Sequence, residues 1–309
     1  AASETIAAAM QVLAHTDAVM FDMRQNGGGF PHTVRFLCSY LFDEPTHLNS
    51  LYFRQGDRTE EFWTLDDLPG TRMPEVPVFV LTSAETFSGA EEFCYNLRTQ
   101  ERATLVGETT RGGANPGGLF DVNPQLEIFI PRGRAINPIT GTNWEGTGVE
   151  PHIAVDAASA LDKALECARP AAEVFRAARV ARWDAFDAAH KEAIRLYDVG
   201  RIGDAAVAIA AGLRAAHAAH LMGEPDINML GYDILQDGRT ALAIAILTFN
   251  VETYPESSNA WDSLGEASMA GGQIDEAIAH YERSIELDPA NENARTKLAE
   301  LRAGQSMTP

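Results

Sequence analysis

The sequence predicts two regions of different fold class: an α/β region with a mainly parallel sheet, followed by an all-α helical-repeat domain. Up to about residue 168, short apolar runs alternate with glycine loops and helical patterns. Strands and helices that alternate at these lengths build parallel sheets through crossover connections. From Arg169 onward the chain is rich in alanine and helical, and its last part repeats with a 34-residue period.

The predicted strands of the first region are short apolar runs that end at polar or glycine-rich segments. They are residues 17–23, 78–82, 104–107 and 126–131. Helical patterns follow the first two, at residues 33–42 and 88–99. Because ligands bind beyond the carboxyl ends of parallel strands, the loops after residues 23 and 82 are the places to look for a site.

The helical region contains two copies of one pattern. Leu-Gly, Ala and Pro recur in register at 34 residues, which resembles tetratricopeptide repeats. The paired positions are Ile227 and Trp261, Leu230 and Leu264, Gly231 and Gly265, Ala243 and Ala277, Leu247 and Tyr281, and Pro255 and Pro289. Such stacks expose a concave surface, so the repeats serve either as a docking module for a protein partner or as a brace on the first region.

These patterns predict the following division of the chain. A core occupies residues 1–168, and a helical linker or irregular helical hairpin occupies residues 169–222. The tetratricopeptide-like repeats occupy residues 223–302, and residues 303–309 form a disordered tail. The chain starts at Ala1 inside a helical pattern, so we expect an N-terminal subdomain and any targeting signal to lie upstream.

The composition excludes several classes of function. The formal net charge of −20 argues against nucleic acid or an anionic membrane as a partner. Three cysteines at irregular spacing indicate neither a disulfide framework nor a zinc site. No run reaches the roughly 20 apolar residues of a membrane span.

Ser88 lies where the run 78–82 gives way to a helical pattern, in the segment Val78–Glu92. Ser88 to Glu91 reads S-x-x-E, so the serine can simply cap the helix. The alternative is a nucleophile at the end of a strand. In that interpretation Gly89 offers a backbone N–H one residue later, where a donor to a developing oxyanion belongs.

A second donor can come from the loop after the first strand, which reads D-M-R-Q-N-G-G-G from Asp22. Its glycines allow the backbone to approach a substrate closely, and the N–H of Gly27 or Gly28 is the candidate donor. A flexible turn would explain the glycines equally well. Asp22 and Arg24 are either a local ion pair that shapes the loop or separately solvated charges.

Four motifs occur in order over residues 17–156: DMRQNGGG, TSAETFSGAEEF, TLVGETTRGGA and GRAINPITGTNWEGTGVEPHI. Together they resemble the tail-specific, or C-terminal-processing, serine peptidases, in their interphotoreceptor-retinoid-binding-protein-like and tricorn-like branch. The resemblance implies a crotonase-like core. It assigns Ser88 as nucleophile, Gly89 and either Gly27 or Gly28 as oxyanion donors, and no metal or organic cofactor. It also suggests a periplasmic or secreted location.

The sequence departs from this family at the base. The processing branch has a lysine 25 residues after the serine, where this chain has Gly113, and Arg111 cannot replace it because guanidinium stays protonated. The tricorn-like branch has a histidine base and a glutamate that orients it. Glu145 lies where that glutamate is expected. None of the histidines at positions 15, 32, 47 and 152 fits that base, so we expect it before Ala1.

The leading hypothesis is therefore a serine peptidase that hydrolyses peptides or unfolded proteins, with Ser88 as nucleophile and Glu145 as the residue that orients the base. Two alternatives stay open. The same fold can serve as a catalytically inactive binding protein for a lipid or peptide, with Ser88 only a helix cap. The chain can also be an interaction scaffold in which the repeats do the work.

Overall fold

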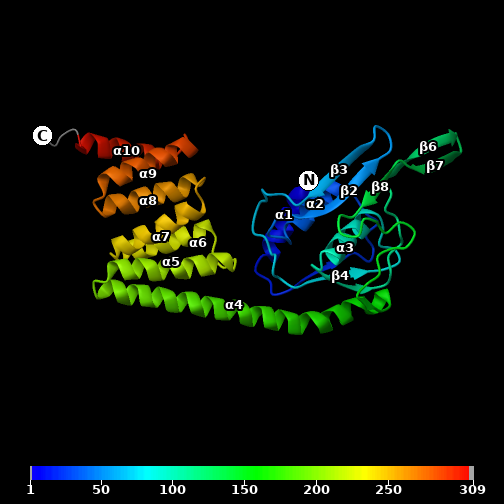
Figure 1. Cartoon of the computed structure of the whole chain (residues 1–309), viewed down its shortest axis with the longest axis horizontal. Helices are drawn as coiled ribbons and strands as arrows, with labels where there is room; N and C mark the ends of the chain where they lie inside the picture. The colour runs from blue at the N-terminus through cyan, green and yellow to red at the C-terminus, as the bar shows by residue number, and fades with distance from the viewer. Residues whose placement is uncertain (1, 306–309) are drawn as a thin grey trace. The chain divides into compact units, whose positions relative to one another are not determined.

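The computed structural model describes residues 2–305. They divide into two compact units, with the boundary between Arg176 and Ala177. The boundary that we expect at residue 168 falls inside one long helix, α4, Ala160–Asp198 (Figure 1). This helix continues through Pro170 and contributes to both units. In the part of the chain that is described, no helix is both long and apolar enough to cross a membrane.

The first unit is built on a four-stranded sheet in which every pair is parallel, in the order β1-β4-β5-β9. The central strand β4 is buried along its whole length. The strands are β1 (Val19–Asp22), β4 (Val78–Thr82), β5 (Thr104–Gly107) and β9 (Ile153–Ala154). The helices are α1 (Ala2–Leu13), α2 (Pro31–Ser39) and α3 (Gly89–Thr99), with a short 3-10 turn at Ala157–Ser159 before α4. The predicted α/β class is confirmed.

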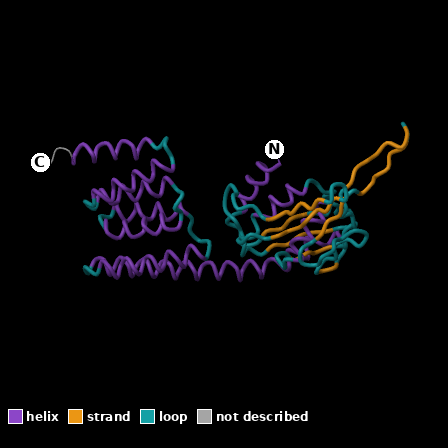
Figure 2. The backbone as a smooth tube through the Cα atoms, turned by 45° about the horizontal axis from the view of Figure 1, so that its top comes forward, coloured by secondary structure: helices purple, strands orange, loops and turns teal. Residues whose placement is uncertain are grey.

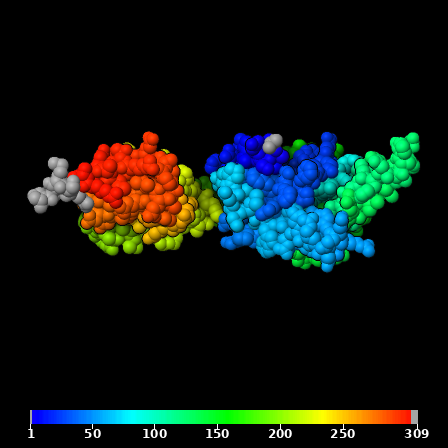
Figure 3. All heavy atoms as spheres, turned by 90° about the horizontal axis from the view of Figure 1, so that it is seen from above, coloured from blue at the N-terminus to red at the C-terminus, as the bar shows by residue number. Residues whose placement is uncertain are grey.

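Two further sheets in this unit are antiparallel. One has the order β3-β2-β8, and the other is the hairpin β6-β7. Their strands are β2 (His47–Phe53), β3 (Arg58–Trp63), β8 (Gly133–Ile136), β6 (Gly117–Asn123) and β7 (Leu126–Pro131). The expected strand at residues 126–131 is present, but it pairs with β6 and lies outside the parallel sheet. The hairpin extends away from the rest of this unit and is exposed along its length (Figures 2 and 3).

The second unit is entirely helical among its described residues. Helices α6, α8 and α10 begin at Glu224, Ser258 and Glu292, which are 34 residues apart. Its helices after α4 are α5 (Ile202–Ala218), α6 (Glu224–Gln236), α7 (Thr240–Thr253), α8 (Ser258–Ala270), α9 (Ile274–Leu287) and α10 (Glu292–Gln305). Because α10 includes residues 303–305, the disordered tail does not start at 303, and residues 306–309 lie outside the described part.

Glycine allows the paired helices of each repeat to approach closely. A Cβ on Gly231 would lie 2.6 Å from Leu247 Cδ2, and one on Gly265 would lie 2.9 Å from Tyr281 Cε1. These two pairs occupy the same positions one repeat apart. The recurring glycine therefore has a packing reason, since a side chain there would displace the large residue of the partner helix.

The core of the first unit contains a buried acid that the sequence analysis did not single out. Glu92, on α3, is 5% exposed and accepts a hydrogen bond from Asn49 Nδ2 at 3.2 Å. Burial raises the pKa of Glu92 from 4.5 to about 7, and the Asn49 hydrogen bond opposes the shift. The protonated form is thus favoured in the folded state more than in the unfolded state.

We predict that Glu92→Gln makes the stability less dependent on pH. Because the pKa of Glu92 is raised in the folded state, its protonated form contributes to the free energy of unfolding. This contribution is fully present below pH 4.5 and is lost as the pH rises through about 7. Between about pH 5 and about pH 8, the wild type should lose up to about 3 kcal/mol relative to the variant. Denaturant unfolding at both pH values measures this. The exposed Glu150→Gln is the matched control, and equal pH profiles for wild type and Glu92→Gln would refute the prediction.

Candidate active site

Ser88 lies in a strained backbone conformation between β4 and α3. Its φ is 54° and its ψ is −122°, a combination that side-chain-bearing residues rarely adopt. Glu91 Oε2 accepts the Ser88 N–H at 2.8 Å, which is one half of a capping box. Strain of this kind persists only where the surroundings hold it, and it clusters at functional sites.

The glycine loop after β1 packs directly on this turn. A Cβ on Gly28, whose φ is +107°, would lie 2.7 Å from Ser88 Cβ and 2.8 Å from Gly89 N. A Cβ on Gly89 would lie 2.8 Å from both N and O of Gly29. The structure therefore brings together the loop and the serine that the sequence analysis selected separately. Only glycine at positions 28 and 89 permits this approach.

Hydrogen bonds between the two loops keep them in this arrangement. Phe87 N donates to Asn26 O at 3.1 Å, and Thr86 Oγ1 donates to Met23 O at 2.8 Å. Ser83 Oγ donates to Arg24 O. Three hydrogen bonds between residues 83–87 and residues 23–26 leave little freedom for one loop to move without the other.

Asp22 and Arg24 form the local ion pair that we considered from the sequence. The Arg24 Nη2 and Asp22 Oδ2 atoms are 2.7 Å apart, and Arg24 Nη1 also donates to Ala157 O at 2.8 Å. The hydrogen bond from Arg24 lowers the pKa of Asp22 below its usual value. The pair thus anchors the start of the glycine loop to the segment that leads into α4.

The backbone N–H groups of the glycine loop are not all available. Gly28 N donates to Asn26 Oδ1 at 3.0 Å, so this N–H is used within the loop. A Cβ on Gly27 would meet nothing within 4 Å, so space is open beside that residue. Of the two glycines proposed as donors, Gly28 fixes the contact with Ser88 while Gly27 borders open space.

Glu91 is a fully buried carboxylate that joins the serine turn to the loop after β5. Its Oε2 accepts from Ser88 N at 2.8 Å and from Gly113 N at 2.9 Å. Its Oε1 accepts from Gly112 N at 2.6 Å and from Thr110 Oγ1 at 2.5 Å. Four donors on one carboxylate offset the cost of burying its charge. The sequence analysis recognised only the first of these four bonds.

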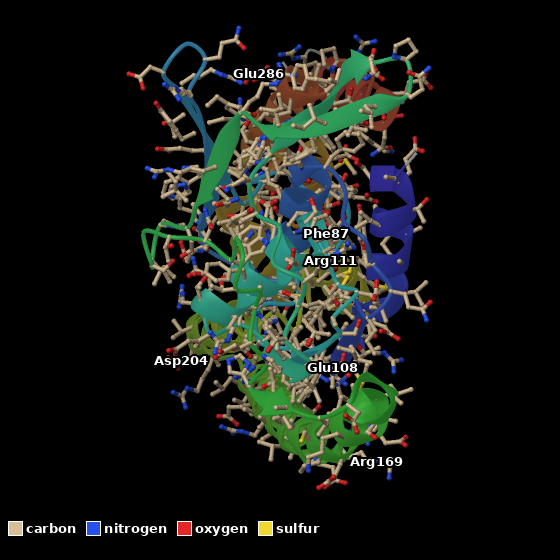
Figure 4. All side chains as sticks on the ribbon, turned by 90° about the vertical axis from the view of Figure 1, so that its right-hand side faces the viewer. Phe87, Glu108, Arg111, Arg169, Asp204 and Glu286 are labelled. Carbon is tan, nitrogen blue, oxygen red and sulfur yellow. The ribbon has the colours of Figure 1, made fainter. Side chains whose placement is uncertain are left out.

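Phe87 occupies the space beside Gly113, the position of the lysine base in the processing branch. A Cβ on Gly113 would lie 2.1 Å from Phe87 Cε2 and 2.5 Å from Phe87 Cζ. The Arg111 guanidinium lies over the Phe87 ring, 5.0 Å from its centre, and Figure 4 shows the two side chains side by side. A lysine at 113 would therefore collide with Phe87 in its present position.

Glu145 is exposed and holds the backbone of a neighbouring loop. Its Oε2 accepts from Ala114 N at 2.7 Å and from Asn115 N at 2.9 Å. Gly146 N donates to Gly112 O at 2.9 Å, which places the Glu145 segment against the loop that Glu91 also binds. The link between Glu145 and Ser88 in the structure is thus indirect, through residues 112–115 and Glu91.

Three of the histidines considered as bases have partners elsewhere. His32 Nε2 lies 3.9 Å from Glu60 Oε1, and His47 Nε2 lies 2.9 Å from Ser50 Oγ. His152 Nδ1 accepts from Leu105 N at 3.0 Å, and burial lowers the pKa of this histidine. Within residues 2–305, no group of three or more His, Cys, Asp or Glu side chains could hold a metal ion.

A cavity of about 870 Å³ lies beyond the carboxyl ends of β1, β4 and β5. The glycine loop forms one wall of it, through Asn26 and Gly27, and Ser83 to Glu85 form another. Glu108 also lines it and accepts from Ala84 N at 3.2 Å and Ala157 N at 3.0 Å, near the start of α4 (Figure 4). These two backbone hydrogen bonds lower the pKa of Glu108. The cavity shares Gly27 with the serine site.

Comparison with known families accounts for this arrangement. The sequence profile of peptidase family S41 matches residues 1–155, half of the chain. The chain belongs to peptidase family S41. The profile of the tetratricopeptide repeat matches residues 265–306. Both expectations from the sequence, the processing-peptidase family and the repeats, are confirmed.

Among solved structures, the chain is similar to the photosystem II D1 C-terminal processing protease, with 20% identity and a TM-score of 0.42, over 50% of this chain and 39% of that one. A putative peptidase from Parabacteroides merdae has 17% identity and a TM-score of 0.46, over 54% of this chain and 56% of that one. The first tetratricopeptide domain of Spaghetti (RPAP3), bound to an HSP90 peptide, has 18% identity and a TM-score of 0.28, over 40% and 94%. The chain thus covers 39% of the length of the D1 processing protease and 56% of the length of the Parabacteroides merdae peptidase.

We predict that Gly28→Ala destabilises the serine turn by about 2 kcal/mol or more, because the new Cβ would collide with Ser88 at a positive φ. Gly29→Ala is the matched control, since a Cβ there would meet nothing within 4 Å. Its effect should stay within about 0.5 kcal/mol. Denaturant unfolding of the two variants and the wild type measures the difference. Equal losses in both variants would show that the loop and the turn do not depend on each other as described.

Proposed function

We propose that this S41 protein is a serine-type peptidase with Ser88 as the nucleophile. One observation carries the proposal: Ser88 is held in a strained turn at a positive φ, and a glycine loop packs directly against it. A residue that served only as a helix cap would not need the positive φ. The substrate class that membership of this peptidase family favours is a peptide or an unfolded protein.

The oxyanion of the tetrahedral intermediate would be bound by backbone N–H groups. Gly89 N follows the nucleophile directly, at the first residue of α3, where the helix dipole also favours negative charge. For the second donor we favour Gly27, because the N–H of Gly28 already donates to Asn26 Oδ1. Each donor of this kind is worth on the order of 3 kcal/mol in the transition state.

In this proposal the proton of Ser88 passes to a general base from outside residues 2–305. Gly113 excludes the lysine, and His32, His47 and His152 are engaged at Glu60, Ser50 and Leu105. We therefore propose a histidine from outside these residues as base and then acid. Glu145, with Oε2 fixed by two backbone N–H groups, would present its other oxygen to orient that imidazole.

The helical repeats form a module for protein or peptide interaction in this proposal. Stacked helical hairpins present extended surfaces that suit such contacts. This part of the chain would select or retain a partner while the α/β unit performs the chemistry. The alternative, a catalytically inactive binding protein that uses the 870 Å³ cavity, rests on the missing base and is one outcome of the next experiment.

We predict that the full-length protein reacts with a fluorophosphonate probe at Ser88. Ser88→Ala should abolish labelling, with a fall of about 100-fold or more, because the probe needs an activated hydroxyl. Ser3→Ala, on the exposed face of α1, is the matched control and should label like the parent. In-gel fluorescence and mass spectrometry of the labelled peptide measure both.

Labelling of Ser88→Ala at the level of the parent would show that the nucleophile is elsewhere. If the parent itself does not label while it remains folded, the inactive binding protein becomes the better interpretation.

A further inference from the structure

An open pocket of about 260 Å³ lies between the turn that joins β2 to β3 and the base of the β6–β7 hairpin. It shares no lining residue with the larger cavity beyond the parallel sheet. Two of its lining residues are arginines, Arg58 at the start of β3 and Arg132 directly after β7. The others are Phe53, Gln55, Pro116 and Gly117. We call these six residues the arginine pocket.

An aromatic ring supports each guanidinium of the arginine pocket. Arg58 Cζ lies 4.9 Å from the centre of the ring of Phe53, its direct cross-strand neighbour. Arg132 Cζ lies 4.5 Å from the centre of the Phe120 ring. A Cβ on Gly118 would lie 3.2 Å from Arg132 Nη2, so the glycine leaves room for this side chain along the hairpin. Stacking uses the flat face of a guanidinium and leaves its N–H edges free for paired hydrogen bonds to a carboxylate.

The charges of the two arginines are only partly compensated. Arg58 Nη1 lies 3.6 Å from Glu60 Oε2, and the Arg58 side chain is 63% exposed. Within residues 2–305, no carboxylate is ion-paired with Arg132. Acidic residues outnumber basic ones by 44 to 24 in this chain, so an arginine that finds no carboxylate beside a pocket is available to an external anion. The uncompensated charge is about one, which suits a single carboxylate better than a polyanion.

A short stretch of backbone connects the arginine pocket to the serine turn. Gly113 N and Ser88 N both donate to Glu91 Oε2, at 2.9 Å and 2.8 Å. Pro116, which lines the pocket, follows Gly113 by three residues. Pro116 therefore lies within roughly 17 Å of Ser88, a distance that about five residues of an extended peptide cover. A peptide of this length at Ser88 is long enough to place a carboxylate in the pocket.

We propose that the arginine pocket binds a carboxylate of the peptide substrate, with Arg132 and Arg58 as the charged contacts. Arg132 forms the paired hydrogen bonds, because Glu60 already competes for Arg58. The inference rests on the proposed peptidase function, since it assigns the pocket to the same substrate. It makes the pocket a specificity-determining site for peptides with an acidic side chain, or the chain terminus, within about five residues of the cleaved bond.

The binding test uses fluorescence anisotropy and the full-length Ser88→Ala variant, which lacks the proposed nucleophile and leaves the peptide intact. The probe is a labelled Gly-Ser peptide with a central pair of glutamates and an amidated C-terminus. The same peptide with glutamines is the neutral control, and the glutamine peptide with a free C-terminus tests the terminal carboxylate as the source. We expect at least one carboxylate-bearing peptide to bind about fivefold or more tightly than the neutral control.

Variants in the same Ser88→Ala background test the residues of the pocket. Arg132→Gln should weaken binding of the carboxylate-bearing peptide about tenfold, and Arg58→Gln about threefold, because Arg58 is shared with Glu60. Glu60→Gln should strengthen binding about twofold, since it removes the competing carboxylate. Arg54→Gln is the matched control. Arg54 is exposed close by but does not line the pocket, so its loss should change the affinity less than about twofold.

Labelling with the fluorophosphonate probe connects the pocket to Ser88. In the parent protein, a saturating concentration of the tighter peptide should slow labelling, because the bound peptide covers the serine, and Arg132→Gln should remove this effect. Thermal melts check that all variants are folded. A folded parent that does not label shows failure of the peptidase proposal, while the binding measurements still decide whether the pocket takes a carboxylate.

Four results would overturn the inference. They are equal binding of charged and neutral peptides, unchanged affinity in both Arg132→Gln and Arg58→Gln, an equal loss in Arg54→Gln, and tight binding that leaves the labelling rate of Ser88 unchanged. The third result would mean general attraction to the arginines of this surface, and the fourth would mean an anion site that is not part of the substrate site.

Discussion

The carboxylate of Glu91 is the interaction on which the serine site depends. It is fully buried, and it accepts hydrogen bonds from the Ser88 turn on one side and from residues 110–113 on the other. A buried charge is tolerated only where hydrogen bonds replace its lost hydration. The four donors do this, and in doing so they determine where the loop after β5 lies relative to the serine. The Glu145 segment reaches the site only through that loop.

Close packing of glycines adds a second constraint to the same place. Gly28 and Gly89 allow two backbones to approach within the reach of a single Cβ, and Gly113 allows Phe87 to lie flat beside the loop. The last contact has a chemical consequence. Where the processing branch has an amine that can take the serine proton, this chain has an aromatic ring under an arginine. In the proposed mechanism, this exchange means that the base comes from elsewhere, while the backbone donors Gly89 and Gly27 keep their places.

The sequence predicted the central parts of the fold well, for identifiable reasons. Strands β4 and β5 were located to the residue because each is a continuous apolar run buried on both faces. The antiparallel sheet β3-β2-β8 was missed because β3 (RTEEFW) is mostly polar and has no such run. The strand at 126–131 is apolar like a buried strand, yet it is exposed in a hairpin, so its hydrophobicity was no guide to its place. The expected boundary at residue 168 falls inside α4, which continues through Pro170.

The site was predictable in part. The motifs selected Ser88 and the glycine loop, and the structure brings them into contact. The bonds of Glu91 to residues 110–113 and the buried Glu92 could not be foreseen, because each depends on residues far apart in sequence. Asn49 on β2 and Glu92 on α3, for instance, meet only when these two elements pack together. The periodicity of apolar residues in the sequence indicates which face of a helix is buried. It does not indicate which polar atoms on that face lack hydrogen-bond partners.

In the proposed mechanism, binding of the oxyanion and transfer of the proton depend on different groups, so the serine turn can be described apart from its base. Backbone donors that face a developing charge contribute through their fixed positions, and they need no proton movement of their own. In serine peptidases, such donors and substrate binding retain part of the rate enhancement even when triad residues are removed. The strained Ser88 turn, Gly89 and the glycine loop are held by contacts internal to the first unit. These contacts therefore preserve the arrangement whatever group supplies the base, and the family's chemistry remains readable in a chain that lacks the family's lysine.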